Sequence, residues 1–305
     1  MKLRDLLREG TEKLKAAGVE NAEYDARQLL NYSYGKTSAQ LLAEMDRDLC
    51  PGATGGTEPA DIVSCPGDCG ARITYNLVLA RRAAREPLQH ILGTAGFMGL
   101  DFHVDPSVLI PRQDTETLVE TVLQEEKDPE ITVLDLCTGS GCIAIALKKL
   151  GAYREVSASD IGKETLKTAR SNARANQAPV SFLESDLFEK IPGKYDLIVS
   201  NPPYMPTGTI DTLEPEVRDH DPRAALDGGA DGLEFYRRII SEAPQHLNHN
   251  GRIYLEIGYD QADAVREMLL AGGFEEVRVI RDLAGLDRVV RAKKGNTLAR
   301  DRQNQ

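Results

Sequence analysis

Two kinds of hydrophobic spacing divide the chain into two parts. In the first part, apolar residues recur at intervals of three and four, which predicts amphipathic helices over residues 1–49 and 75–86. Residues 50–71 interrupt this pattern with glycine, proline and cysteine, so we expect a loop or insert there. Residues 89–93 and 101–104 then alternate like short strands around several glycines, which predicts a β-hairpin.

From residue 131 onward, strand-like apolar runs alternate with helical patterns. The predicted strands cover residues 131–136, 155–158, 180–183, 195–200, 252–257, 277–282 and 288–292. One predicted helix follows the first of these strands and extends to Leu150. The others cover residues 163–176, 233–247 and 261–271. This alternation predicts a mostly parallel α/β sheet with helices on both faces, whose last two strands are antiparallel neighbours. Ligands of such sheets bind at the carboxyl ends of the strands.

Length and charge narrow the class of protein. The chain has 305 residues, 41% of them hydrophobic, which is enough for a large core. Its 48 acidic and 37 basic residues give a net charge of −11, which disfavours binding by coating nucleic-acid phosphates. No apolar run reaches the roughly 18 residues of a membrane span, and the charged start has no signal-peptide stretch. We therefore expect a cytoplasmic monomer with no membrane partner and no direct nucleic-acid partner.

A glycine-rich loop follows the first predicted strand of the sheet. Residues 134–144 read LDLCTGSGCIA, and Gly139, Gly141 and Ala144 match G-x-G-x-x-A at a strand-to-helix junction. Asp160 stands about 20 residues further on, at the end of the second strand, where a carboxylate can accept two ribose hydroxyls. This combination predicts a site for a cofactor that carries adenosine, and it fits both NAD and S-adenosylmethionine.

The tetrapeptide Asn201-Pro202-Pro203-Tyr204 directly follows the strand-like run YDLIVS. The two prolines fix the backbone, so the Asn201 side-chain oxygen and the Pro202 carbonyl can converge on one NH2 group. Tyr204 offers a flat face to a planar amide or base. Hydrogen bonds accepted from that NH2 group favour attack of its nitrogen on a sulfonium methyl, with no strong general base. The tetrapeptide therefore indicates methyl transfer from S-adenosylmethionine to a planar amino group.

These motifs resemble the amino-group methyltransferases that use S-adenosylmethionine, and further stretches resemble the HemK/PrmC family in particular. They are the hairpin region from His90 to Phe102, the segment LIPRQDTE at 109–116, and the segment from Glu214 to Leu233. The resemblance covers about residues 75 to 292. The chain departs from the family where Gln113 replaces a frequent proline, where Cys137 replaces a frequent glycine, and in the insert.

The resemblance implies a fold and an activity. The fold is that of a class I S-adenosylmethionine-dependent methyltransferase, Rossmann-like with a mostly parallel seven-stranded sheet, after a small N-terminal helical domain. The family methylates the side-chain amide nitrogen (N5) of the glutamine in the GGQ motif of class I peptide chain release factors. We expect a helical domain at 1–87, a hairpin connector at 88–108, a methyltransferase domain at 109–292 and a polar, disordered tail at 293–305.

Positions that match the family motifs imply individual roles. The methionine end of the cofactor would lie against Cys137, Thr138, Gly139, Ser140 and Gly141. The ribose would bind Asp160, and the adenine would contact Asp186 and Leu187, although these two also suit an ordinary strand-end acid and a core leucine. The catalytic residues would be Asn201, Pro202 and Tyr204, and together with Pro203 they would bind the glutamine. Asn201 would also touch the cofactor.

Other residues keep two interpretations. Arg112 and Glu116 would lie near the mouth of the site or form a salt bridge or helix cap, and Phe97 would line the glutamine channel or pack in the hairpin. The histidines show no metal spacing, and we predict no metal in the active site. Cys50, Cys65 and Cys69 are expected to be free thiols, with a zinc site or a redox pair as alternatives.

Several functions compete with methylation of release factors. A ribosomal-protein glutamine methyltransferase would share the same core. A nucleic-acid methyltransferase acting on adenine N6 or guanine N2 would use the same tetrapeptide, but the acidic charge disfavours it. An NAD oxidoreductase would explain the glycine loop alone, and a non-enzymatic binding module would leave Asn201 and Asp160 without a role.

Overall fold

The structure is a computed structural model that describes residues 1–49 and 68–295. Most of the predicted insert, with Cys50 and Cys65, and most of the predicted tail lie outside these residues. The end of the insert and the start of the tail differ from the predicted boundaries. Residues 69–71 already belong to a helix, and the last strand includes Lys293 and Lys294, where we expected the tail to begin.

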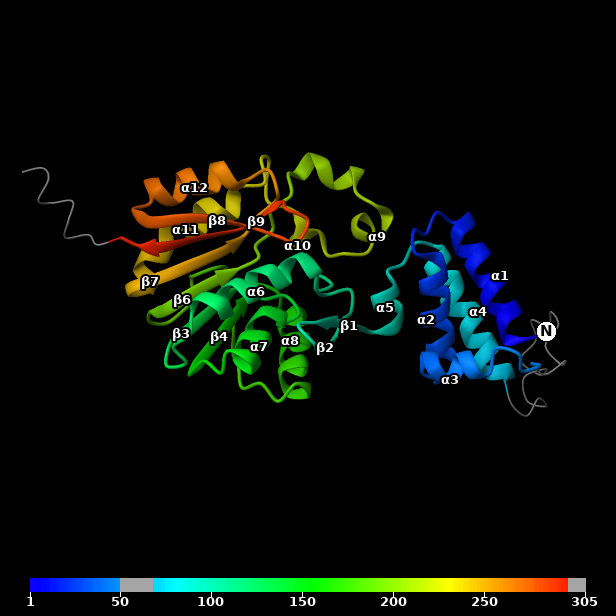
Figure 1. Cartoon of the computed structure of the whole chain (residues 1–305). Coiled ribbons are helices and arrows are strands. Elements are labelled where there is room, and N and C mark those ends of the chain that lie inside the picture. The colour runs from blue at the N-terminus through cyan, green and yellow to red at the C-terminus, as the bar shows by residue number, and fades with distance from the viewer. Residues whose placement is uncertain (50–67, 296–305) are drawn as a thin grey trace, which may run out of the picture. The chain divides into compact units, whose positions relative to one another are not determined.

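The chain forms two units; in Figure 1 the first is blue to cyan except for one short yellow-green segment that contains α9 (Pro215–Arg218). The first unit comprises Met1–Gly93 together with the short segment Pro215–His220. The second comprises Thr94–Glu214 and the chain from Asp221 onward. The chain therefore passes between the units three times.

The first unit is a helical domain. Its helices are α1 (Leu3–Ala16), α2 (Ala22–Tyr34), α3 (Ser38–Ala43), α4 (Cys69–Ala83) and α5 (Leu88–Leu92). Their apolar faces enclose one core, in which Leu14, Leu29 and Leu30 are fully buried. The predicted helices near the N-terminus are thus present.

Two predictions for this unit are wrong. Residues 89–92 belong to helix α5 and not to a strand, because Pro87 caps the start of the helix and Gly93 ends it in a left-handed conformation (φ 73°). Proline before and glycine after a short apolar run is a helix signal that we interpreted as strand alternation. Cys69 is disulfide-bonded, so the free thiol expected there is also wrong.

An ion-pair cluster lies within the first unit. Arg82 Nε donates to Asp25 at 2.7 Å, and its Nη1 donates to Glu216 at 2.9 Å. Arg85 adds two bonds to the same Glu216 carboxylate, at 2.7 and 2.6 Å. The side chains of Asp25 and Arg82 are each only 8% exposed. These contacts attach the segment 215–220, which follows the tetrapeptide in sequence, to the helical domain.

The second unit contains a seven-stranded sheet. In sheet order its strands are β5 (Ser181–Glu184), β4 (Glu155–Asp160), β3 (Thr132–Leu136), β6 (Tyr195–Ser200), β7 (Leu247–Glu256), β9 (Asp287–Lys294) and β8 (Phe274–Arg281). The first five are parallel, and β9 pairs antiparallel with both β7 and β8. The predicted sheet, including its antiparallel end, is confirmed.

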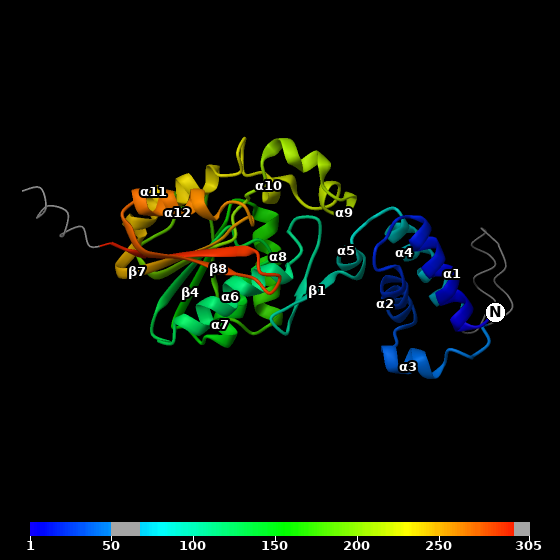
Figure 2. The same cartoon turned by 45° about the horizontal axis from the view of Figure 1, so that its top comes forward.

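Helices cover both faces of this sheet (Figures 1 and 2). One face packs on α6 (Gln113–Glu125), α7 (Cys142–Leu150) and α8 (Lys163–Ala175), where residues such as Leu118 and Ile143 are buried. The other face packs on α11 (Glu234–His246) and α12 (Ala262–Ala271), with Tyr236 and Val265 in its core. The central strands β3 (TVLDL) and β6 (YDLIVS) are mostly apolar, as expected for parallel strands covered on both faces.

The elements not yet described are short. We did not predict the longer helix α6. A hairpin of β1 (Thr94–Phe97) and β2 (Leu100–His103) precedes it. The 3₁₀ helix η2 (Thr207–Thr212) and the helices α9 (Pro215–Arg218) and α10 (Arg223–Leu226) follow β6. Within the described residues, no helix is long and apolar enough to cross a membrane. The expectation of a cytoplasmic monomer stays a prediction.

Candidate active site

The order of the strands brings the predicted site residues to one edge of the sheet. The strands β5, β4, β3 and β6 are consecutive neighbours, and all four run parallel. Their carboxyl ends lead in turn into the two residues predicted to contact adenine, Asp160, the glycine loop and the tetrapeptide. Segments that are up to some seventy residues apart in the sequence are therefore adjacent at the edge where such sheets bind ligands.

Hydrogen bonds to the ends of β3 and β4 hold the glycine loop, which connects β3 to α7. The backbone N–H of Thr138 donates to Ser159 O at 3.0 Å, and its hydroxyl donates to the carboxylate of Asp135 at 2.6 Å. Asp135 is fully buried, and this burial raises its pKa to about 7. The loop is thus fixed to the ends of two strands before any ligand arrives.

The upper side of the loop leaves room for a ligand. Gly139 has φ 54°, and a Cβ placed on it would meet no atom within 4 Å. Glycine adopts this left-handed conformation without strain, and because it has no side chain it leaves the adjacent space open to a ligand. Cys137 also has a positive φ, 57°, which explains why glycine is frequent there in the family. Burial raises the pKa of the Cys137 thiol, so this residue contributes a neutral side chain.

Asp160 stands beside the glycine loop at the end of β4. Its Oδ2 accepts the backbone N–H of Gly139 at 3.0 Å, and its Oδ1 accepts that of Gly162 at 2.9 Å. Burial raises the pKa of this carboxyl, and the two backbone hydrogen bonds oppose the rise. Each carboxylate oxygen has a second lone pair, so the group can still accept two hydroxyls from a ribose.

The two residues predicted to contact adenine differ from each other. Asp186 forms an ion pair with Arg238 of α11, 2.8 Å apart, so its carboxylate already has a cationic partner. Leu187 is 4% exposed and packs in the core beneath the site. The interpretation of Leu187 as a core leucine describes its packing, while its contact with adenine stays a prediction.

The tetrapeptide is locked by a segment further along the chain. The N–H of Met205 donates to Leu226 O, and the N–H of Gly228 donates to Met205 O, at 2.9 and 2.8 Å. A Cβ on Gly228 would lie 2.7 Å from Tyr204 Cα and 2.8 Å from Pro203 O. Glycine is therefore required where these two stretches of backbone meet.

Tyr204 is held at both its backbone and its ring. Its carbonyl accepts a hydrogen bond from Gln261 Nε2 at 2.9 Å. Its ring packs against the core of the α11 face, and burial raises the pKa of its hydroxyl to about 12. The phenol is therefore neutral at physiological pH, and the ring offers a fixed apolar surface.

Asn201 has a polar environment that the sequence reasoning missed. Its Nδ2 donates to Thr115 Oγ1 of α6 at 3.2 Å. Ser200 pairs with Leu255 across β6 and β7, which places Asn201 next to Glu256 in the same register. Glu256 is 2% exposed. A glutamate at the end of the run RIYLE, on the strand beside the asparagine, was the available signal.

The residues with two interpretations take structural roles. Glu116 Oε1 accepts the backbone N–H of Met98 at 2.5 Å, which ties the hairpin turn to α6. Arg112 precedes α6 and forms an ion pair with Asp221, whose side chain is fully buried. Phe97 is 1% exposed and packs edge to face on Phe102, with ring centroids 6.1 Å apart. The hairpin-packing interpretation therefore describes Phe97.

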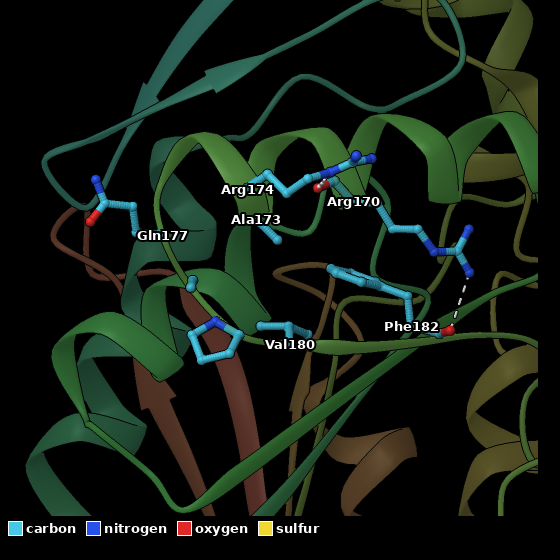
Figure 3. Close-up of a pocket in the computed structure, with 8 residues that line it drawn as sticks. Arg170, Ala173, Arg174, Gln177, Val180 and Phe182 are labelled. Carbon is cyan, nitrogen blue, oxygen red and sulfur yellow. Dashed lines mark hydrogen bonds between the residues drawn. The ribbon is translucent and has the colours of Figure 1, made fainter.

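A separate cavity of about 550 Å³ opens beside α8 and the edge strand β5. Figure 3 shows that Arg170 and Arg174 extend over it, with Val180 and Phe182 opposite. Val180 precedes β5 and Phe182 lies in its first half, so the cavity is at the amino end of that strand. None of the predicted site residues lines it. Across residues 1–49 and 68–295, no group of three or more histidine, cysteine or acidic side chains could hold a metal ion.

Comparisons with known families match both units. The family model described as the PrmC N-terminal domain matches residues 5–54, and the one described as the methyltransferase small domain matches residues 112–213. The second match spans the glycine loop, Asp160 and the tetrapeptide. The first match includes α2 and α3 and most of α1 of the helical domain, and the second includes the four strands β3, β4, β5 and β6.

Relatives and one solved structure agree with these matches. A release factor glutamine methyltransferase of Geobacter sulfurreducens is 42% identical and covers 92% of this chain and 93% of its own length. A protein of the same name from Moorella thermoacetica is 40% identical, covering 94% and 97%. A methyltransferase structure from Pyrococcus furiosus, 21% identical, covers 74% of this chain and 98% of its own, with a TM-score of 0.51. That structure supports the fold alone.

Proposed function

The chain belongs to the family of release factor glutamine methyltransferases, and we propose that it methylates the glutamine amide of a class I peptide chain release factor. The methyl donor is S-adenosylmethionine, and the acceptor is the side-chain nitrogen (N5) of the glutamine in the GGQ motif. The observation that carries this proposal is the juxtaposition of Asn201-Pro202-Pro203-Tyr204 with the glycine loop and Asp160 at one edge of the sheet.

The residues present fit the methyl donor. The open space over Gly139 admits a ligand, and Asp160 keeps acceptor capacity for the ribose hydroxyls. Residues Cys137 to Gly141 would lie along the methionine end, and Leu187 with Asp186 near the adenine. When bound there, S-adenosylmethionine would supply a sulfonium methyl group for transfer to a substrate amide that the neighbouring tetrapeptide holds.

The tetrapeptide supplies the acceptor side of the reaction. The Asn201 side-chain oxygen and the Pro202 carbonyl would accept the two hydrogens of the substrate amide, and the Tyr204 ring would support its plane. Because the prolines and the Gly228 contact fix this backbone, the acceptors are in place before the substrate binds. The proton of the methylated nitrogen leaves after transfer, so the neutral Tyr204 hydroxyl is not needed as a base.

A second candidate function shares this chemistry. A ribosomal-protein glutamine would fit the same four residues, since they contact only the amide and its plane. The names of the relatives favour the release factor. The net charge of −11 continues to disfavour a nucleic-acid base as acceptor.

A methyl-transfer assay tests this proposal. The full chain would be incubated with S-adenosylmethionine that carries a labelled methyl group and, separately, with a class I release factor, ribosomal proteins, DNA and RNA. We expect label on the release factor only. Label on a ribosomal protein or on nucleic acid, with none on the release factor, would replace the proposal with the corresponding alternative.

A further inference from the structure

A buried carboxyl group lies behind Asn201, and the proposed chemistry does not use it. Glu256 ends β7, is 2% exposed, and has one carboxylate oxygen, Oε2, without a hydrogen-bond partner. Hydrogen bonding with Thr115 and Asn201 lowers the pKa of Glu256 against the effect of burial, so both side chains lie close to this carboxyl group. Burying a carboxyl that is incompletely hydrogen-bonded costs stability, which calls for a functional reason.

The three side chains form a directional network. The Thr115 hydroxyl accepts a hydrogen bond from Asn201 Nδ2 at 3.2 Å, which leaves its own proton available for the nearby carboxylate of Glu256. An ionised carboxylate can only accept hydrogen bonds, and a hydroxyl that donates its one proton to it can accept on its other side. Both neighbours of Asn201 on this side are therefore acceptors. Only the NH2 end of the Asn201 amide satisfies them.

This arrangement bears on which end of the Asn201 amide faces a substrate. The two ends of an asparagine amide have nearly the same shape and can exchange by a flip about the Cβ–Cγ bond. Only the oxygen end can accept an N–H of a substrate amide. We propose that Glu256 is a positioning residue that, through Thr115 and directly, keeps the NH2 of Asn201 inward and its oxygen facing the substrate amide. This inference rests on the proposed function for its catalytic consequence.

The charge state of Glu256 decides whether the orientation is enforced. Burial raises its pKa to about 7, against the hydrogen bonds from Thr115 and Asn201 and the positive charge of Arg288. The charged and titratable groups around it are Asp114 of α6, Arg288 of β9, Tyr204, Tyr236 of α11 and Cys142 of α7. A protonated Glu256 is itself a donor and tolerates the flipped amide. The active form of the network is therefore the ionised one, which predominates above neutral pH.

Substitutions that keep the shape test this role. We expect Glu256→Gln and Thr115→Val each to lower kcat about tenfold above neutral pH, the worth of roughly one hydrogen bond. The Kd of S-adenosylmethionine and the KM of the release factor should change little, and Thr115→Ser should restore kcat because it keeps the hydroxyl. Glu267→Gln, the same change on the exposed side of α12, is the matched control.

The pH profile separates positioning from mere structure. In the wild type, kcat should rise with pH through neutrality as Glu256 ionises, and Glu256→Gln should lack this rise. A merely structural glutamate would lower kcat equally at every pH. Wild-type kcat in Glu256→Gln, or the same inflexion in both proteins, would overturn the inference.

A measurement without substrate keeps this test independent of the proposed function. The side-chain NH2 resonances of Asn201, identified in asparagine-labelled protein by their loss in Asn201→Ala, should shift with pH around neutrality in the wild type. They should not shift over that range in Glu256→Gln. Resonances that ignore pH in the wild type would refute the network. Titrating resonances in a protein that does not methylate release factors would refute the function and keep the network.

Discussion

At the scale of single residues, Asp160 is the residue that we propose binds the ribose of the cofactor. Its two oxygens are already oriented by the backbone N–H groups of Gly139 and Gly162. Such pre-orientation means that little entropy is lost when the ribose binds. The binding energy should therefore depend on this one side chain.

Asp160→Ala is expected to weaken the binding of S-adenosylmethionine by about 1.5–3 kcal/mol, since it removes hydrogen bonds to a charged group. Calorimetric titration of the full chain measures this loss. Asp263→Ala, on the exposed first turn of α12, is the control and should bind normally. An affinity equal to that of the wild type would exclude Asp160 as the ribose ligand.

The same carboxylate predicts a pH dependence of binding. Burial raises the pKa of Asp160 above its usual 3.8, so the group takes up a proton at a higher pH than an exposed aspartate. The protonated form loses its charge and one acceptor. Affinity for S-adenosylmethionine should fall as the pH is lowered into the acid range. The fall should be absent in Asp160→Asn, and an equal fall in that variant would assign the effect to another group.

Sequence reasoning reached some of these residues and not others. The glycine loop, Asp160 and the tetrapeptide were predictable because each has an unusual local spacing. Thr115 and Glu256 were not, because a threonine in a helix and a glutamate at a strand end are ordinary residues. Only the register of β6 against β7 brings Glu256 next to Asn201.

At the scale of elements, the site depends on one backbone-to-backbone contact. Gly228 lies against the tetrapeptide at a distance that no side chain allows, 2.7 Å from its would-be Cβ to Tyr204 Cα. Because this atom belongs to the backbone, it cannot rotate away. The contact therefore fixes where the hydrogen-bond acceptors of the tetrapeptide lie.

Gly228→Ala is expected to displace the tetrapeptide and lower kcat roughly tenfold to a hundredfold, the cost of a small misplacement of reacting groups. The affinity for S-adenosylmethionine should stay near that of the wild type. Gly208→Ala is the matched control, because a Cβ there would meet nothing within 4 Å and neither glycine has a positive φ. Equal kcat values in the two variants would show that the contact does not position the site.

Most elements of the sheet were predictable, and the errors have a common origin. Strands buried on both faces appear in the sequence as mostly apolar runs, which identified β3 and β6 to within one residue. Short elements failed, because residues 89–93 are too few to separate a helical from an alternating pattern. There the capping residues Pro87 and Gly93 carried the information.

At the scale of the whole molecule, the segment 215–220 leaves the methyltransferase unit and joins the helical one. Its Glu216 shares Arg82 with the buried Asp25. Removing one partner from a buried ion pair leaves the other charge uncompensated, which is more costly than the pair itself is favourable. The helical domain should therefore be sensitive to Arg82.

Arg82→Met is expected to destabilise the helical domain by roughly 3–5 kcal/mol, because it leaves Asp25 buried without its cation. Hydrogen exchange of the α1, α2 and α4 amides measures this loss for the domain alone. Arg81→Met is the matched control, since Arg81 is 47% exposed and pairs with Glu86 at the surface, a contact worth about 1 kcal/mol or less. Similar losses in the two variants would contradict the buried-pair account.

Glu216 adds a pH dependence to the same cluster. Burial would raise its pKa, but the hydrogen bonds from Arg85 and Arg82 outweigh burial and hold the pKa below the usual 4.5. A carboxyl whose pKa is lower in the folded than in the unfolded state stabilises the domain. The stabilisation is complete at pH values above the unfolded-state pKa, and it is lost as the pH falls through the folded-state pKa. Protection of the helical domain should therefore decrease below about pH 4.5 in the wild type, and less so in Glu216→Gln.

The central claim is that Asn201 directs a methyl group onto a glutamine amide nitrogen of a release factor. Tandem mass spectrometry of a class I release factor, treated with S-adenosylmethionine and either the wild type or Asn201→Ala, tests it most directly. We predict one added methyl group on the GGQ glutamine with the wild type, and at least about 100-fold slower addition with Asn201→Ala, although that variant binds the cofactor normally. A methyl group on any other residue, or equal methylation by both proteins, would contradict this account.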